Sequence, residues 1–228
     1  NTVSDFIVLW GERTKQNFIG LFKKTKIVVL GTDIYQHLPD EKGEYRKEFI
    51  TLALNLKSDK LNKYLIDKVC SQMTCLGESE KRNYSFVLKL HPEMNFKYWE
   101  SLFLKAMKRH SLKMNCHVYS YENKLVLNKS KILIVLSSGI SMEAFICGVS
   151  VICIDDIPNF YINPLVYFKN IPESIVNIEN ISLEIQNRLN NTFYSNKILA
   201  KQKKSLKEEI AYFDSSKREL DWINQLIK

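Results

Sequence analysis

The sequence predicts an α/β fold in which a parallel sheet carries helices on both of its faces. Short apolar runs alternate along the chain with segments of helical periodicity, which is typical of repeated strand–helix–strand units. Two of the runs, residues 27–30 (IVVL) and 132–136 (ILIVL), are apolar at every position, as expected for strands that helices cover from both sides. The chain has 228 residues, of which 45% are hydrophobic, and can therefore bury a core large enough for such a sheet.

The individual elements follow from these apolar runs and from the periodic segments between them. The expected strands are residues 6–11, 26–33, 49–56, 84–90, 116–122, 131–136 and 149–155. The expected helices are residues 12–24, 60–73, 96–110, 123–130 and 141–148, followed by a helical, amphipathic C-terminus from about residue 183 to residue 228. The helix at 60–73 illustrates the periodicity, because Leu61, Leu65, Ile66 and Val69 fall on one stripe.

The segment 131–155 is nearly free of charge in its interior, where Glu143 is the one exception. Its length suits a membrane span, since roughly 20 apolar residues cross a bilayer. A span would, however, leave Glu143 in hydrocarbon at a cost of a few kcal/mol. Gly139, Gly148 and the serines beside them punctuate the segment as turns would, and we therefore predict a strand–helix–strand unit.

The net charge of +8 raises the question of a nucleic-acid partner, but the lysines are scattered along the chain. Their one concentration, at residues 197–209, interleaves acidic residues at helical spacing, which is typical of a solvated helix face. We therefore expect no nucleic acid as a partner. The positive balance fits anionic partners in general, such as phosphorylated donors, acidic glycans or a membrane surface with peripheral association.

Parallel sheets bind ligands at the carboxyl ends of their strands, and one of these ends is rich in serine and glycine. The strand that ends at residue 136 is followed by Ser137, Ser138, Gly139, Ser141 and Glu143. Glycine permits a tight turn and close approach of a ligand, a serine can cap the next helix, and the helix terminus favours an anion. Glu143 can accept hydrogen bonds from ribose hydroxyls. The pattern predicts a phosphate-binding turn, and an ordinary capped helix is the alternative interpretation.

A second strand end carries His91-Pro92, directly after the strand at 84–90. Proline suits the first turn of a helix, where its missing N–H is not needed, and His91 can donate a hydrogen bond to a phosphate oxygen. Tyr121 stands at a third strand end, in residues 120–122. Because these strands belong to one predicted sheet, we expect their ends to contribute to one site.

The stretches LKLHPE (88–93) and ILIVLSSGISMEAFICGVSVI (132–152) together resemble the carboxyl-terminal, Rossmann-like half of GT-B glycosyltransferases. They are most similar to the bacterial capsule and lipopolysaccharide enzymes that transfer sialic acid or Kdo from a CMP-sugar to a surface glycan. Those enzymes contact the CMP moiety through an HP and an SS motif, and their histidine assists departure of the phosphate. The resemblance covers about residues 49–155. It implies that His91 is catalytic and that His91, Pro92, Ser137 and Ser138 contact the nucleotide. From the strand ends we add four further nucleotide- or phosphate-binding residues, which are Gly139, Ser141, Glu143 and Tyr121.

The resemblance also implies a division of the chain. Residues 1–48 would be the last strand–helix–strand unit and linker of a preceding, acceptor-binding domain, and residues 49–228 the donor-binding domain with its C-terminal helices. In sialyl-type enzymes the base comes from a motif of two acidic residues followed by glycine. Residues 40–43 (DEKG) match this motif only in part, because a lysine separates the acidic pair from the glycine. We therefore expect the base and most of the acceptor site outside this chain. No metal or other cofactor is expected, because no DxD triplet occurs on a suitable loop and positive groups can neutralise the leaving phosphate.

A second resemblance leaves other functions open. The turn at residues 137–141, called the serine turn below, is also similar to that of UDP-N-acetylglucosamine 2-epimerases. The Arg- and Glu-rich stretch of those enzymes is replaced here by DDIPNFYINP (155–164). UDP-sugar or CDP-glycerol transferases and a non-catalytic nucleotide-sugar-binding module are further alternatives. Five cysteines without a CxxC pair indicate a reducing compartment, so we expect a cytoplasmic location, at the inner face of the membrane if the protein associates with it.

Overall fold

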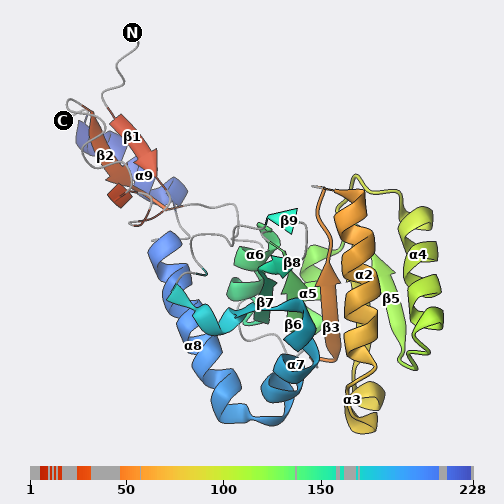
Figure 1. Ribbon diagram of the computed structural model, residues 1–228. Coiled ribbons are helices and arrows are strands. Elements are labelled where there is room, and N and C mark those ends of the chain that lie inside the picture. Colours follow the sequence, from red (N-terminus) through yellow and green to blue (C-terminus); the bar gives the residue numbers. More distant parts are fainter. Residues whose placement is uncertain are drawn as a thin grey trace.

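The computed structural model of the chain describes residues 6–9, 11, 13, 15–16, 25–31, 47–56, 58–136, 138–157, 160–161, 168, 170–210 and 215–226. Figure 1 shows a large body, built around the main sheet, and a smaller one made of β1, β2 and α9 near both ends of the chain. The predicted base motif at residues 40–43 lies outside the described residues.

The main sheet has six strands in the order β10-β7-β6-β3-β4-β5, and every neighbouring pair is parallel. The strands are β3 (Phe49–Ala53), β4 (Ser85–Lys89), β5 (Cys116–Tyr119), β6 (Ser130–Val135), β7 (Ser150–Ile154) and β10 (Ile175–Val176). This confirms the predicted α/β fold with a parallel sheet. The sequence did not predict β10, which is only two residues long and follows the 3-10 turn Pro172–Ser174.

Helices cover both faces of this sheet, as predicted (Figure 1). One face carries α2 (Asp59–Met73), α4 (Phe96–Arg109) and α7 (Ile181–Asn190), and the other carries α5 (Asn123–Lys129), α6 (Ile140–Ile146) and α8 (Thr192–Glu209). The short helix α3 (Glu78–Asn83), absent from the prediction, leads from α2 into β4. Side chains of a strand alternate between the faces, so Ile50 and Leu52 enter one core and Ala53 the other.

The segment 131–155, which is nearly free of charge in its interior, folds as β6, α6 and β7, and this confirms the predicted strand–helix–strand unit. All five residues of β7 are buried, because helices lie on both sides of this strand. The chain then forms the short antiparallel pair β8 (Asp156–Ile157) and β9 (Phe160–Tyr161). Among the residues that the structure describes, no helix is both long enough and apolar enough to cross a bilayer.

The smaller body joins the two ends of the described chain. Strands β1 (Phe6–Leu9) and β2 (Lys26–Val29) pair in parallel, and residues 13, 15 and 16 between them are helical. The ring of Trp222 on α9 (Ser215–Leu226) packs edge-on against Phe6, with 5.0 Å between the ring centroids. Arg13 forms ion pairs with Glu208 and Glu209 at the end of α8. Helix α9 therefore packs beside the first described strand of the chain.

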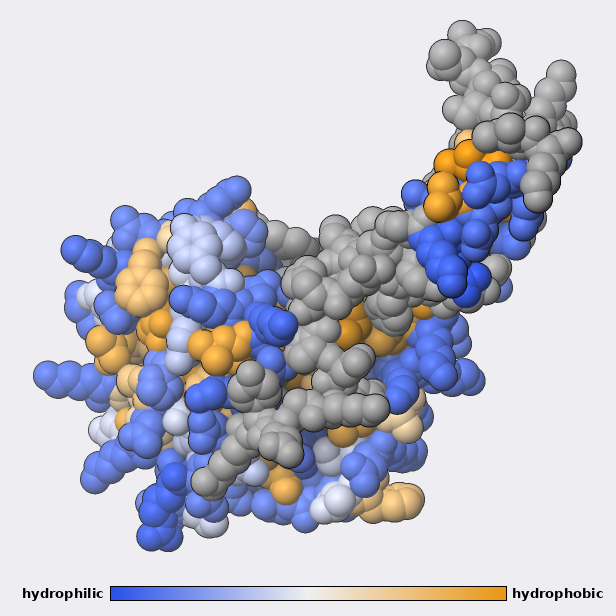
Figure 2. All heavy atoms as spheres, turned by 180° about the vertical axis from the view of Figure 1, so that it is seen from behind, coloured by the Kyte–Doolittle hydropathy of each residue, from blue (hydrophilic) through white to orange (hydrophobic). Residues whose placement is uncertain are grey.

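The surface gives little sign of a large apolar patch on the face opposite to that of Figure 1. Figure 2 shows mainly hydrophilic side chains on the described part of the larger body, with hydrophobic groups scattered between them. Scattered exposed apolar side chains are normal for a folded protein. A cleft on this body lies at one edge of the main sheet.

Candidate functional site

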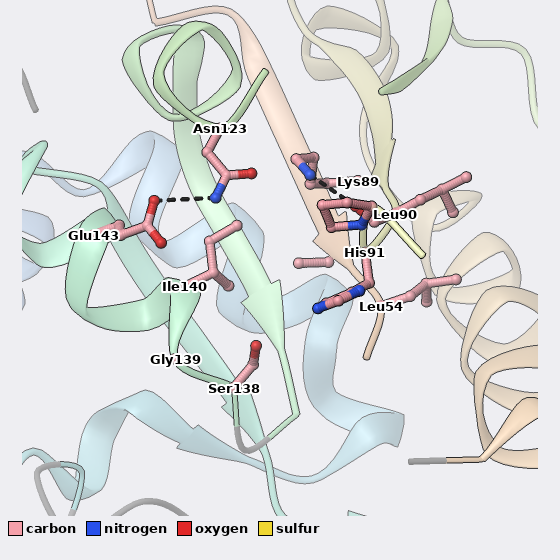
Figure 3. Close-up of a pocket in the computed structure, with 11 residues that line it drawn as sticks. Leu54, Lys89, Leu90, His91, Asn123, Ser138, Gly139, Ile140 and Glu143 are labelled. Carbon is pink, nitrogen blue, oxygen red and sulfur yellow. Dashed lines mark hydrogen bonds between the residues drawn. The ribbon is translucent and has the colours of Figure 1, made fainter. Parts of the chain in front are cut away.

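The candidate site is a cleft at the carboxyl edge of the main sheet, where the strand order reverses. The chain runs from β3 outward through β4 to β5, and then returns to β6 on the other side of β3. Such a switch point is the usual ligand position in open α/β sheets. Here it forms a cleft of about 540 Å³. Its lining residues are Ala53, Leu54, Lys89, Leu90, His91, Pro92, Asn123, Ser138, Gly139, Ile140 and Glu143 (Figure 3).

The cleft brings together five of the residues that the sequence singled out. They are His91, Pro92, Ser138, Gly139 and Glu143. Figure 3 shows His91 on one wall and Ser138, Ile140 and Glu143 on the other. Ser141 and Tyr121 do not line the cleft, and Ser137 lies outside the described residues.

The ring of His91 is oriented by the turn that follows β4. The backbone N–H of Glu93 donates to Nδ1 of His91 at 3.3 Å, and the N–H of Met94 donates to the His91 carbonyl at 3.0 Å. Because Nδ1 accepts a hydrogen bond, the neutral ring carries its proton on Nε2. His91 can therefore offer an N–H donor through Nε2.

Pro92 lies in this turn and not in the first turn of a helix, so that prediction was wrong. Helix α4 begins at Phe96, and Asn95 is its N-cap. The Oδ1 of Asn95 accepts a hydrogen bond from the backbone N–H of Tyr98 at 3.0 Å. Asparagine satisfies an N–H that the helix would otherwise leave unpaired, and this local bond sets the helix start beyond the proline.

The serine turn differs in detail from the expected capped turn. Gly139 has an ordinary helical backbone, with φ −60° and ψ −26°, and no side-chain hydrogen bond caps α6. Ser141 is fully buried, and its Oγ donates to the carbonyl of Ser138 at 2.8 Å, which holds the turn together from inside. A Cβ atom added at Gly139 would meet no atom within 4 Å. The backbone at Gly139 therefore faces open space and is not required by a strained conformation.

Glu143 is held in place by Asn123, the first residue of α5. The Nδ2 of Asn123 donates to Oε2 of Glu143 at 3.1 Å, shown as a dashed line in Figure 3. A carboxylate offers about four lone-pair sites, so this bond leaves acceptor capacity for hydroxyl groups of a ligand. Tyr121, by contrast, is 72% exposed and does not line the cleft.

Lys89 is a lining residue that the sequence reading missed. It is the last residue of β4 and only 2% exposed, and its Nζ donates to the carbonyls of Leu90 at 2.7 Å and Ser120 at 2.6 Å. Burial lowers the pKa of Lys89, and the nearby Glu122 and Glu143 act in the opposite direction. The available signal was a single lysine inside the apolar run FVLKL, immediately before His91.

The described residues contain no group of three or more His, Cys, Asp or Glu side chains that could hold a metal ion.

No protein-family model and no curated protein sequence matches the chain.

Several solved structures match the chain in three dimensions. A UDP-GlcNAc 2-epimerase from Neisseria meningitidis, bound to UDP-GlcNAc, has a TM-score of 0.60 at 16% identity over 97% of this chain and 61% of its own. A glycosyltransferase from Rickettsia africae has a TM-score of 0.54 at 13% identity, over 98% of this chain and 64% of its own. HepE from Anabaena, in complex with UDP and glucose, has a TM-score of 0.52 at 12% identity, over 98% of this chain and 63% of its own.

These matches establish the fold. The larger body has the Rossmann-like architecture of GT-B domains, with a six-stranded parallel sheet flanked by helices and a helical C-terminus. The chain spans less than two thirds of the length of each of the three matched structures.

Proposed function

We propose that this chain supplies the nucleotide-sugar-binding domain of a GT-B glycosyltransferase. The observation that carries the proposal is the cleft, in which His91 and Pro92 stand opposite Ser138, Gly139 and Glu143 at the switch point of the sheet. A nucleotide sugar as ligand is supported by two of the matched structures, which hold UDP with glucose and UDP-GlcNAc.

In this proposal the two walls of the cleft act on different parts of the donor. The Nε2–H of His91 donates to the phosphate, and this bond strengthens as the sugar–oxygen bond breaks and negative charge develops on the leaving oxygen. The open backbone at Gly139 lets the phosphate approach closely. Glu143, held by Asn123, accepts hydrogen bonds from the ribose. The sugar carbon bonds to an acceptor hydroxyl, whose proton passes to a base that we assign to a second domain.

We propose a CMP-linked acidic sugar of the sialic acid or Kdo type as donor and a surface glycan as acceptor. The support for this finer assignment is the HP and SS motifs, in which Ser137 would join Ser138 at the CMP moiety. The donor is then a substrate, and the proposal includes no resident cofactor. The net charge of +8 favours an acidic glycan, or peripheral contact with the inner face of the membrane.

Nucleotide choice is the direct test of the proposal. Isothermal titration of the chain with CMP, UDP and ADP is expected to give the tightest binding for CMP. A tenfold preference for UDP, which is about 1.4 kcal/mol, would move the protein to the UDP-sugar enzymes. Failure to bind any of the three nucleotides would refute the proposed function itself.

A UDP-GlcNAc 2-epimerase-like enzyme is the second candidate, because the fold of this chain matches that of the Neisseria meningitidis epimerase with a TM-score of 0.60. The stretch DDIPNFYINP at residues 155–164 lacks the arginine expected of that class. Incubating the protein with UDP-GlcNAc and analysing the sugar separates the two candidates, since only an epimerase inverts carbon 2. A non-catalytic module would bind the nucleotide, would leave UDP-GlcNAc unchanged and would release no CMP from a CMP-sugar.

The replacement Gly139→Ala tests how closely the ligand approaches the serine turn. A methyl group at this position meets no atom within 4 Å and the backbone is helical, so the free energy of unfolding should change by less than about 1 kcal/mol. Affinity for CMP should fall by about tenfold or more, because the methyl group occupies the space in which the phosphate lies. Unchanged affinity for CMP in this folded variant would show that the phosphate does not lie against Gly139.

A further inference from the structure

Lys89 carries a charge in a place where proteins seldom bury one. Its side chain is 2% exposed, and lysine is almost never buried to this degree without a partner of opposite charge. Its two hydrogen-bond acceptors are backbone carbonyls, of Leu90 and Ser120, and among the described residues its ammonium group has no ion pair with a carboxylate. An ammonium group has three N–H donors, so the described residues leave one of them without an acceptor.

The position of Lys89 connects this donor with the cleft. Lys89 lines the cleft together with His91, Asn123 and Glu143. Through the carbonyls of Leu90 and Ser120 it also ties together the ends of β4 and β5, which are neighbouring strands. The ammonium group is therefore held at a fixed point in the wall, two residues before the histidine.

A structural tie between two carbonyls does not need a charge. A neutral amide or hydroxyl donor could bond them, whereas an ammonium group adds the cost of removing a charge from water. That cost is offset when an anion lies close to the charge in a site of low dielectric constant. The charge thus points to an anionic group of the ligand, and in a nucleotide this group is the phosphate.

We propose that Lys89 is the fixed positive charge of the cleft and directs its third N–H to the phosphate of the ligand, so that the site selects nucleotides over nucleosides. This inference rests on the proposed function and assigns a binding role to a residue outside the HP and SS motifs. The phosphate would then lie between Lys89 and His91 on one wall and the open backbone of Gly139 on the other.

The test compares CMP with cytidine, which lacks only the phosphate, by isothermal titration of the 228-residue chain. The wild-type chain should bind CMP at least about tenfold more tightly than cytidine, the effect of one charge-assisted hydrogen bond. Lys89→Gln keeps an N–H donor for the carbonyls but removes the charge, and should lose most of this preference while its cytidine affinity changes less than about twofold. Lys89→Arg keeps the charge and should retain a clear part of the preference.

Lys124→Met is the matched control, because Lys124 is an exposed lysine on α5 next to Asn123. Lys124→Met should leave the preference for CMP over cytidine unchanged. If it loses as much of this preference as Lys89→Gln does, the preference comes from the net positive charge of the protein, and the specific role of Lys89 is refuted. Equal losses of CMP and cytidine affinity in Lys89→Gln would reduce Lys89 to a structural tie. Equal affinity of the wild-type chain for CMP and cytidine would overturn the inference even if no Lys89 variant folds. Wild-type chain that binds no nucleotide would instead refute the proposed function.

Discussion

Turnover of a transferase that contains this chain should fall by about 10²–10⁴-fold when His91 is replaced with alanine, the range for a positioned acid. The Glu93 N–H bonded to Nδ1 orients the ring so that Nε2 carries the donor, and this donor gains importance as charge develops on the leaving phosphate. Affinity for CMP should fall far less, because Lys89 and the serine turn still line the cleft. The measurement is release of CMP from the CMP-sugar, with turnover and affinity determined separately.

Two further variants make this prediction specific. His91→Asn supplies an amide donor and should recover part of the binding but little of the rate, since an amide does not transfer a proton. His117→Ala removes an exposed histidine of β5 that does not line the cleft, and should leave turnover unchanged. Near-normal turnover of His91→Ala would make His91 a structural residue at a strand end and would remove the HP motif from the mechanism.

The largest effect on stability is expected from Arg188→Met, which should lower the free energy of unfolding by about 3–5 kcal/mol. Arg188 on α7 is 1% exposed and forms an ion pair with Glu184 at 2.7 Å. Its guanidinium also donates to the Oγ of Ser150 at 2.9 Å and to the carbonyls of Val151 at 2.8 Å and Glu173 at 3.1 Å. Methionine fills the space but removes the donor of the Val151 and Glu173 carbonyls, and it leaves the Glu184 carboxylate with the hydroxyl of Tyr194 but without its cation. Urea denaturation followed by circular dichroism measures the loss.

Arg109→Met is the matched control, because Arg109 also pairs with a carboxylate, that of Asp67 at 2.6 Å, but its side chain is 66% exposed. Water replaces that partner, so the expected loss is about 0–1 kcal/mol. The double variant Glu184→Leu with Arg188→Met should be more stable than Arg188→Met alone, since no buried charge is left unpaired. A loss below about 1 kcal/mol for Arg188→Met would show that this buried network contributes little to the fold.

The sequence by itself determined the alternation of strands and helices and therefore the layered α/β fold. The strands β3, β4, β6 and β7 are apolar runs with clear ends, and helices α2 and α4 have regular apolar stripes, so local pattern and burial agree. The rule that ligands bind at the carboxyl ends of parallel strands was enough to select His91, Ser138, Gly139 and Glu143. His91 follows β4, and Ser138 and Gly139 follow β6, which are the strands on either side of β3. Glu143 lies in the first turn of α6.

Only the tertiary structure decided which side chains at those ends face the cleft. The rule that ligands bind at the carboxyl ends of strands selects an edge of the sheet, but it does not say which side chains at that edge face the ligand. Ser141 and Tyr121 were therefore predicted with the others, although Ser141 is buried beneath the turn and Tyr121 is exposed to solvent. The sequence analysis did not select Lys89, because nothing in the local pattern predicts that this lysine is buried and lines the cleft. Lys89 interrupts the apolar run FVLKL, and its buried ammonium group is satisfied in part by the carbonyl of Ser120, which lies 31 residues away, directly after β5.

The same limit applies to the outer parts of the fold. Strand β10 has two residues, too few for any periodicity, and exists because Ile175 and Val176 meet the end of β7. Helix α9 has an ordinary amphipathic pattern, which predicts a helix but not the surface that it covers, and Phe6 near the other end of the chain provides that surface. Contacts between residues far apart in the sequence are decided by the packing of complete elements, because no local pattern records the neighbour that a side chain will meet.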